Sequence, residues 1–188
     1  MDALFAQFNA IYPMSDGLQE FLAAHLKRRE LKRGEFLVKK GNVNTVGSFL
    51  NSGLLHCYYP ENDKKITSWF VQEKNLSIAV GSFFSQEMSY ESIQAMQPCE
   101  LFYLTSEELQ TAYTSFLELN FIIREMLQVY YRAKEQHTYQ LQRGTIKDRF
   151  DWFTNTFSDL VTIVPMKYIA TFLGVAEETL SRIRSAKS

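Results

Sequence analysis

The stretch MKYIATFLGVAEETLSRIR, residues 166–184, divides into two short helical patterns that meet at Gly174. Glycine readily takes the positive φ that a tight turn between two helices demands. Ala170 is small where the helices must approach closely, and five apolar positions fall where such a pair packs into its domain: Ile169, Leu173, Val175, Leu180 and Ile183. A chance pair of helices could share part of this pattern. All seven positions together predict a helix-turn-helix of the DNA-binding kind.

The second helix of such a motif enters the major groove of DNA. Its polar positions are the predicted DNA-binding residues: Glu177, Glu178, Thr179, Ser181, Arg182, Arg184 and Lys187. Arginine can form two hydrogen bonds to guanine, and glutamate can accept one from N4 of cytosine. A solvated helix end would explain Lys187 equally well, and Arg182 could instead pair with Glu178 four residues earlier. The grouping of Glu178, Thr179 and Arg182 on one helix face favours DNA contact.

The chain is helical in pattern from residue 105 onward. Thr105 and Glu108 have the spacing of a capping box, which predicts that a helix begins there. A longer helix, expected over about 116–141, carries apolar residues at alternating spacings of three and four, as in a coiled-coil seam. The predicted dimer interface is this row: Leu119, Ile122, Met126, Val129 and Ala133.

One apolar row could also pack against the β-rich part of the same chain. A second row lies beside the first on this helix: Ile123, Leu127 and Tyr130. Two adjacent rows favour a second partner, and hence a homodimer.

Before residue 105, a helix is expected over 15–27, with Ser15 as its N-cap. Short runs of β-branched and aromatic residues follow, separated by Gly, Asn, Asp and Pro. The expected strands are 36–38, 46–50, 54–59, 66–71, 76–80, 90–95 and 99–104. Many short strands at this spacing indicate a β-sandwich or barrel. The fold class is therefore predicted as α+β.

Several of these segments together resemble the Crp/Fnr family of transcription regulators. They are LKRGEFLVKKG at 31–41, the turn at 51–53, the long helix, and ETLSRI at 178–183. The resemblance covers nearly the whole chain. It implies a double-stranded β-roll of the cyclic-nucleotide-binding type over 1–115, a dimerisation helix over 116–142, and a helix-turn-helix domain over 143–188. It also implies a homodimer that reads a palindromic operator in double-stranded DNA. The β-roll of such a regulator could bind a small-molecule effector.

This sequence departs from the family pattern at the ligand site. Family members that bind cyclic AMP use a glutamate for the ribose and an arginine for the phosphate. The resemblance places Ala79 and Ser89 at these positions, and no arginine occurs from residue 58 to residue 123. We therefore expect a ligand pocket unsuited to cyclic AMP, formed by Ala79, Gly81, Ser82, Ser89 and Tyr90.

A second departure is that the sequence ends about one turn past the recognition helix, without room for a two-stranded wing. We expect this to weaken DNA binding. Together with the acidic pair Glu177 and Glu178, it keeps an alternative open. The chain could be a cyclic-nucleotide-binding-like sensor or protein-interaction module that does not bind DNA.

The composition is that of an ordinary globular protein, with 46% hydrophobic and 22% charged residues. The formal net charge is −1, but a local basic patch matters more for phosphate contact. No apolar run approaches the roughly 18 residues of a membrane helix, and the acidic N-terminus is unlike a signal peptide. A cytoplasmic protein without membrane contact is expected.

The cysteines and histidines show no metal-ligand spacing. They are Cys57, Cys99, His25, His56 and His137. Structural thiols are the simplest interpretation of the two cysteines. No nucleophile–base pattern or phosphate-binding loop is evident, so no enzyme activity, metal or cofactor is expected.

Overall fold

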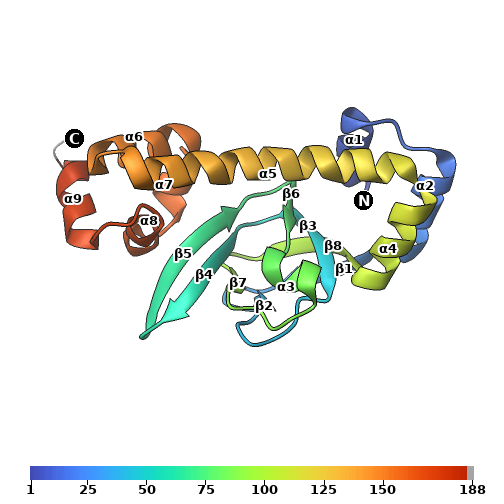
Figure 1. Ribbon diagram of the computed structural model, residues 1–188, viewed down its shortest axis with the longest axis horizontal. Helices are drawn as coiled ribbons and strands as arrows, with labels where there is room; N and C mark the ends of the chain where they lie inside the picture. Colours follow the sequence, from blue (N-terminus) through green and yellow to red (C-terminus); the bar gives the residue numbers. More distant parts are fainter. Residues whose placement is uncertain (186–188) are drawn as a thin grey trace.

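The computed structural model describes residues 1–185 and combines two antiparallel sheets with a 27-residue helix and a group of short helices at its C-terminal end (Figure 1). The predicted α+β class is confirmed. The long helix α5, Leu117–Arg143, runs along the whole molecule, with the sheets beneath its middle. None of the helices within residues 1–185 combines the length and apolar character needed to cross a membrane.

Each sheet has four strands, in the orders β1-β8-β3-β6 and β2-β7-β4-β5. The strands are β1 Lys27–Leu31, β2 Phe36–Val38, β3 Val46–Ser52, β4 Leu55–Glu61, β5 Lys64–Val71, β6 Asn75–Ser77, β7 Ser92–Ala95 and β8 Cys99–Thr105. Chain neighbours repeatedly lie in different sheets, so the backbone winds between the two layers as a β-roll. Only β4 and β5 are joined directly as a hairpin, paired from Leu55 and Val71 to Glu61 and Lys64.

The N-terminal part holds three elements that the sequence pattern does not reveal. These are α1, Asp2–Ile11; β1; and α3, Val80–Ser85. Four of the five β1 residues are exposed because it is an edge strand, so its charged sequence KRREL shows no alternation. The helix expected over 15–27 ends at His25 as α2, Asp16–His25, and Ser15 caps it by accepting from Leu18 N–H.

The capping box at Thr105 and Glu108 is confirmed and starts α4, Ser106–Ser115. A second capping box, between Thr145 and Asp148, starts α6, Ile146–Thr156. The remaining helices are α7 Leu160–Ile163, α8 Met166–Phe172 and α9 Glu177–Ser185.

The apolar core forms two clusters. The first joins α1, α2, α4 and the start of α5 to the sheet that contains β3 and β8. The second runs without a break from the other sheet into the C-terminal helices. In this second cluster, Phe172 of α8 lies 5.7 Å from Trp69 and 5.5 Å from Phe70 of β5, measured between ring centroids. The helix-turn-helix is therefore docked on the β4–β5 hairpin rather than held by α5 alone (Figure 1).

The predicted dimer row on α5 is divided between the interior and the surface. Leu119 and Ile122 are buried in the first cluster of the same chain, so the alternative of packing on its own β domain holds for these two. Met126 and Ala133 are half-buried against the roll, and Val129 is 54% exposed. A partner helix could reach Val129 but not the first two residues.

Candidate nucleic-acid interface and effector cavity

The turn between α8 and α9 has the geometry that its sequence predicts. Gly174 has φ of 67°. The N–H of Val175 donates to the carbonyl of Ala170 at 3.0 Å, and the N–H of Gly174 donates to the carbonyl of Thr171 at 3.2 Å. This pair of bonds is a Schellman motif, which satisfies the last carbonyls of α8. The positive φ explains why glycine occupies this position.

Arg149 of α6 fixes this turn relative to the end of α5. Its guanidinium donates to three carbonyls: Leu173 at 3.0 Å, Leu141 at 2.8 Å and Gly144 at 3.0 Å. Carbonyls at helix C-termini lack partners within their own helix. One side chain thus satisfies the ends of both α5 and α8, and so holds the motif at a defined angle to the long helix.

The helix α9 turns its apolar side inward and its polar side to solvent. Leu180 is fully buried and Ile183 is half-buried. Of the predicted DNA-binding residues, the structure places Glu177, Glu178, Ser181, Arg182 and Arg184 at the surface and leaves Thr179 half-buried; Lys187 lies outside the described residues. Both Glu178 and Arg182 are described, and they form no ion pair with each other. The guanidinium of Arg182 is therefore not engaged by that carboxylate.

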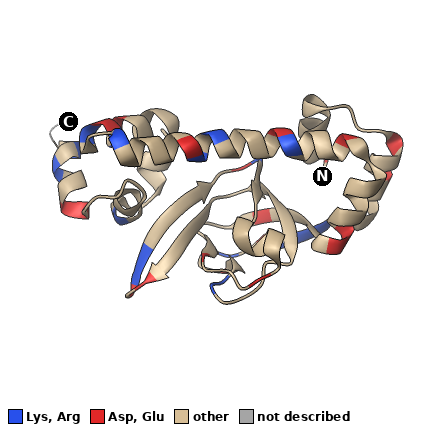
Figure 2. Ribbon diagram, viewed as in Figure 1, with Lys and Arg blue, Asp and Glu red and all other residues tan. Residues whose placement is uncertain are grey.

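The charge around the motif is nearly balanced. Residues 143–185 contain six Lys and Arg against five Asp and Glu, a net charge of +1. Acidic side chains stand at the start of α9 and basic ones further along it (Figure 2). Non-specific attraction to phosphates grows with the number of cations brought to the backbone.

The polar groups of the segment predicted to form the ligand pocket are hydrogen-bonded within the chain. Asn44 accepts from the N–H of Ala79 at 2.7 Å, and its own N–H donates to Ser82 Oγ at 2.9 Å. The Ser89 hydroxyl donates to the carbonyl of Glu91 at 2.9 Å. The chain itself therefore satisfies these polar groups. Of the two remaining predicted residues, Tyr90 is 61% exposed and packs over Gly81.

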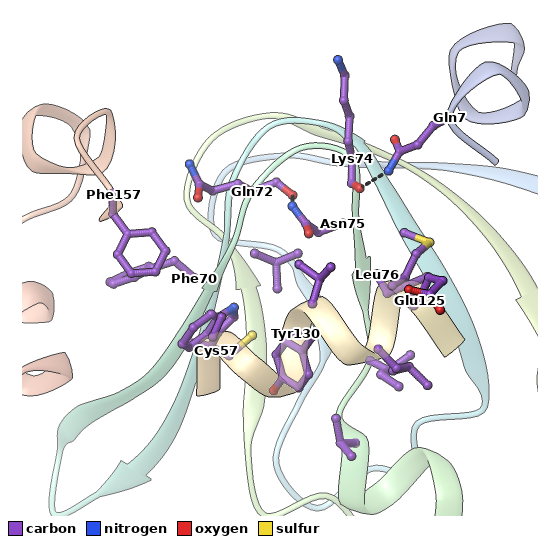
Figure 3. Close-up of a pocket in the computed structure, with 18 of the residues that line it drawn as sticks. Gln7, Cys57, Phe70, Gln72, Lys74, Asn75, Leu76, Glu125, Tyr130 and Phe157 are labelled. Carbon is purple, nitrogen blue, oxygen red and sulfur yellow. Dashed lines mark hydrogen bonds between the residues drawn. The ribbon is translucent and has the colours of Figure 1, made fainter. Parts of the chain in front are cut away.

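A cavity of about 610 Å³ lies beside that segment, between the roll and α5 (Figure 3). Most of its wall is apolar or aromatic: Trp69, Phe70, Val71, Leu76, Ile78, Met126, Leu127, Val129, Tyr130, Ala133 and Phe157. Its charged residues are Glu91, Glu125 and Lys74, and Lys74 is the one cation in the part of the wall that the structure describes. A cavity of this size and lining suits an apolar or aromatic molecule.

Glu91 in the cavity wall and Lys134 on α5 are two half-buried charged groups. Glu91 accepts from the hydroxyl of Ser68 at 3.2 Å, and Lys134 donates to the carbonyl of Ser68 at 2.9 Å. Burial raises the pKa of Glu91 and lowers the pKa of Lys134, because both charged forms lose hydration. The ammonium of Lys134 also lies 4.8 Å from the ring of Trp69.

Three functional features of the structure are absent from the sequence predictions. Asn44 and Arg149 carry no local pattern, because their partners are distant backbone groups. The cavity wall had a signal in the two apolar rows of α5. Met126, Val129 and Ala133 of the first row line the cavity, as do Leu127 and Tyr130 of the second.

No protein-family model matches the sequence, and no curated protein matches it. Solved structures match its fold. CLP of Xanthomonas campestris, described as a c-di-GMP-responsive global regulator, is 17% identical, with a TM-score of 0.72 and coverage of 92% of this chain and 91% of that one. FixK2 of Bradyrhizobium japonicum is 15% identical, with a TM-score of 0.73 and coverage of 86% and 83%.

A structure from Eubacterium rectale, described as a transcriptional regulator of the Crp/Fnr family, is 15% identical, with a TM-score of 0.73. It covers 98% of this chain and 87% of its own. The chain thus has the fold of Crp/Fnr regulators, as the sequence resemblance predicts.

We predict that neither cyclic AMP nor cyclic GMP binds tightly. The N–H of Ala79 is already bonded to Asn44, no arginine occurs from residue 58 to residue 123, and the cavity wall offers two carboxyls against one lysine. The loss of one charge-assisted phosphate contact removes about 1.5–3 kcal/mol, or roughly ten- to a hundredfold in affinity. Isothermal titration calorimetry with each nucleotide measures this. A low-micromolar dissociation constant for either would contradict the prediction.

Proposed function

We propose that this chain is a DNA-binding transcription regulator of the Crp/Fnr type. Its α9 would read an operator, and its cavity would hold an effector other than a cyclic nucleotide. The observation that carries the proposal is the geometry of α9. Buried Leu180 and the Schellman turn at Gly174 orient this helix so that Arg182 and its polar neighbours face solvent. The similar solved structures are regulators and not enzymes, which supports a regulatory rather than a catalytic role.

The proposed regulator acts as a homodimer on a palindromic site. Two copies would associate along α5, where Val129 is 54% exposed on the predicted dimer row. In a symmetric dimer the two half-sites are centred about 34 Å apart, one turn of DNA.

One observation favours a second candidate function. The exposed carboxylates of Glu177 and Glu178 stand at the start of α9, where recognition helices usually meet base edges. Phosphates would repel them unless N4–H of a cytosine donates a hydrogen bond to one of the carboxylates. A sensor or protein-interaction module without DNA binding would show no selection of DNA fragments by the purified chain.

Arg182→Ala tests the base-reading role. Fragments selected from genomic DNA by the parent protein provide the operator. The variant is expected to bind it about 1–3 kcal/mol more weakly, or about 5- to 150-fold, and to lose preference at one position in each half-site. Fluorescence anisotropy against a library of single-base operator variants measures both quantities.

Arg33→Ala is the matched control, since Arg33 is also exposed but lies in the loop between β1 and β2. It should leave affinity and base preference unchanged. Unchanged affinity and preference in Arg182→Ala as well would show that Arg182 does not read bases.

Val129→Glu tests the dimer. Val129 is 54% exposed at the cavity wall, so the substitution should leave the fold intact and place an unpaired charge in the contact between two copies. Multi-angle light scattering should show a dimeric parent and a monomeric variant at micromolar concentration. Gln142→Glu, an exposed position near the end of the same helix, should stay dimeric. A monomeric parent would refute the proposed dimer.

A further inference from the structure

The contact between the β4–β5 hairpin and α8 contains an unusual set of polar and aromatic side chains. We call it the joint. Its polar half consists of His56 on β4, Thr67 on β5, and Tyr168 and Thr171 on α8. Its aromatic half consists of Trp69, Phe70, His137, Trp152 and Phe172. Both tryptophans of the chain lie there.

A chain of hydrogen bonds crosses the polar half. Thr171 Oγ1 donates to the carbonyl of Tyr168 at 3.1 Å and accepts from the N–H of Thr67 at 3.2 Å. The hydroxyls of Thr67 and Thr171 are 2.8 Å apart, and Nε2 of His56 is 2.9 Å from Thr67 Oγ1. Since the hydroxyl of Thr171 donates to Tyr168, the network assigns donation by Thr67 to Thr171 and by His56 Nε2–H to Thr67.

The imidazole of His56 is almost fully buried among rings. Its centroid is 4.4 Å from Tyr168 and 5.5 Å from Phe70. In the aromatic half, the ring of His137 stacks on Phe172 at 3.9 Å, and its Nε2 donates to the carbonyl of Phe172 at 2.7 Å. Both imidazoles therefore help hold α8, one from the roll and one from α5.

The charged groups near these imidazoles are cations. Two cations lie around His56: Lys65 of β5 and Lys167 of α8. The other groups there are uncharged. They are the phenols of Tyr58 on β4 and Tyr168 on α8, and the amide of Gln94 on β7. Around His137, the nearby charged group is Lys134 on the same helix; α6, α8 and β5 contribute the rings of Trp152, Phe172 and Trp69. Among the described residues, neither imidazole forms an ion pair with a carboxylate.

We infer that the joint is a pH-sensitive latch: protonation of His56 releases α8 from the β4–β5 hairpin. A second proton would put a cation between Tyr168 and Phe70 with Lys65 as its nearest charged neighbour, and nothing described there would neutralise it. Opening exposes the imidazole to water, where its charge is hydrated.

The sign of the effect follows from the burial of His56. Burial, followed by the neighbouring Lys65, lowers the pKa of His56 to about 3 in the docked state. In the open state the pKa returns to its ordinary value of 6.5. The stability of the docked state relative to the open state is therefore greatest above pH 6.5 and decreases as the pH falls toward 3. Between pH 8 and pH 5, linkage makes the open state about 30-fold more populated relative to the docked state. Burial also lowers the pKa of His137, which adds to the effect in the same direction.

The consequence for DNA rests on the proposed function. A released α8 no longer holds α9 at a fixed angle, so operator affinity should fall in acid. The latch itself does not depend on DNA, and it can be measured on the free protein.

Amide hydrogen exchange tests the latch. Protection factors, which correct for the intrinsic pH dependence of exchange, are measured for the α8 amides at pH 8 and pH 5, with the β3 amides as internal reference. In the parent, protection of α8 should drop about 30-fold relative to β3. In His56→Gln the drop should be several-fold smaller, with only the contribution of His137 remaining. The emission of Trp69 and Trp152 reports the same change.

Thr171→Val is the second variant, because it breaks the hydroxyl chain and keeps the imidazole. It should lower α8 protection at both pH values and preserve the parent's dependence on pH. An equal drop in the parent and in His56→Gln, or no drop in the parent, would overturn the inference. If the parent shows the expected pH dependence of α8 protection but selects no DNA fragments, the latch stands and the proposed function alone is refuted.

Discussion

The packing of Phe172 between the roll and the C-terminal helices is the contact on which the rest of the architecture depends. Its ring lies against Trp69 and Phe70 of β5 and against Phe153 and Phe157. Aromatic side chains bury large areas, so this cluster stabilises the docked arrangement strongly. The helix-turn-helix and the roll consequently share one core, although the sequence divides them into separate domains.

This shared core links the cavity to α9. Trp69, Phe70 and Phe157 form part of the cavity wall and also contact Phe172. Packed interiors have little free volume, so a molecule that displaces these rings must also change their contacts with α8. Coupling of this kind acts in both directions: a ligand that favours one position of α8 binds more tightly when α8 is held there. The Arg149 contacts restrict how α8 can move, since they tie its end to the end of α5.

Much of the fold can be predicted from the sequence because it depends on local chemistry. The capping box at Thr105, the glycine turn at residue 174 and the long apolar helix each follow from spacing within a few residues, and the structure has all three. The strand β1 escapes such prediction because an edge strand with an exposed face needs no apolar alternation.

The candidate sites are less predictable because distant residues build them. The segment at residues 79–90 looks like a ligand pocket until Asn44, 35 residues before Ala79, accepts its hydrogen bond. The apolar row on α5 reads as one seam, but the contacts of the roll bury Leu119 and Ile122 and leave Val129 outside. Nothing near Thr171 in the sequence indicates its bond to Thr67, 104 residues earlier.

The docked position of α8 is the central claim, and a designed disulfide tests it most directly. The hydroxyls of Thr67 and Thr171 are 2.8 Å apart, so cysteines at both positions should reach bonding geometry without backbone movement. In the variant Thr67→Cys/Thr171→Cys, mild oxidation at neutral pH should form an intramolecular disulfide between residues 67 and 171. Cys57 and Cys99 should stay reduced, because burial raises the pKa of both thiols. Mass spectrometry of unreduced peptides identifies the link. Free thiols at both new positions, or links only between molecules, would contradict the docked arrangement.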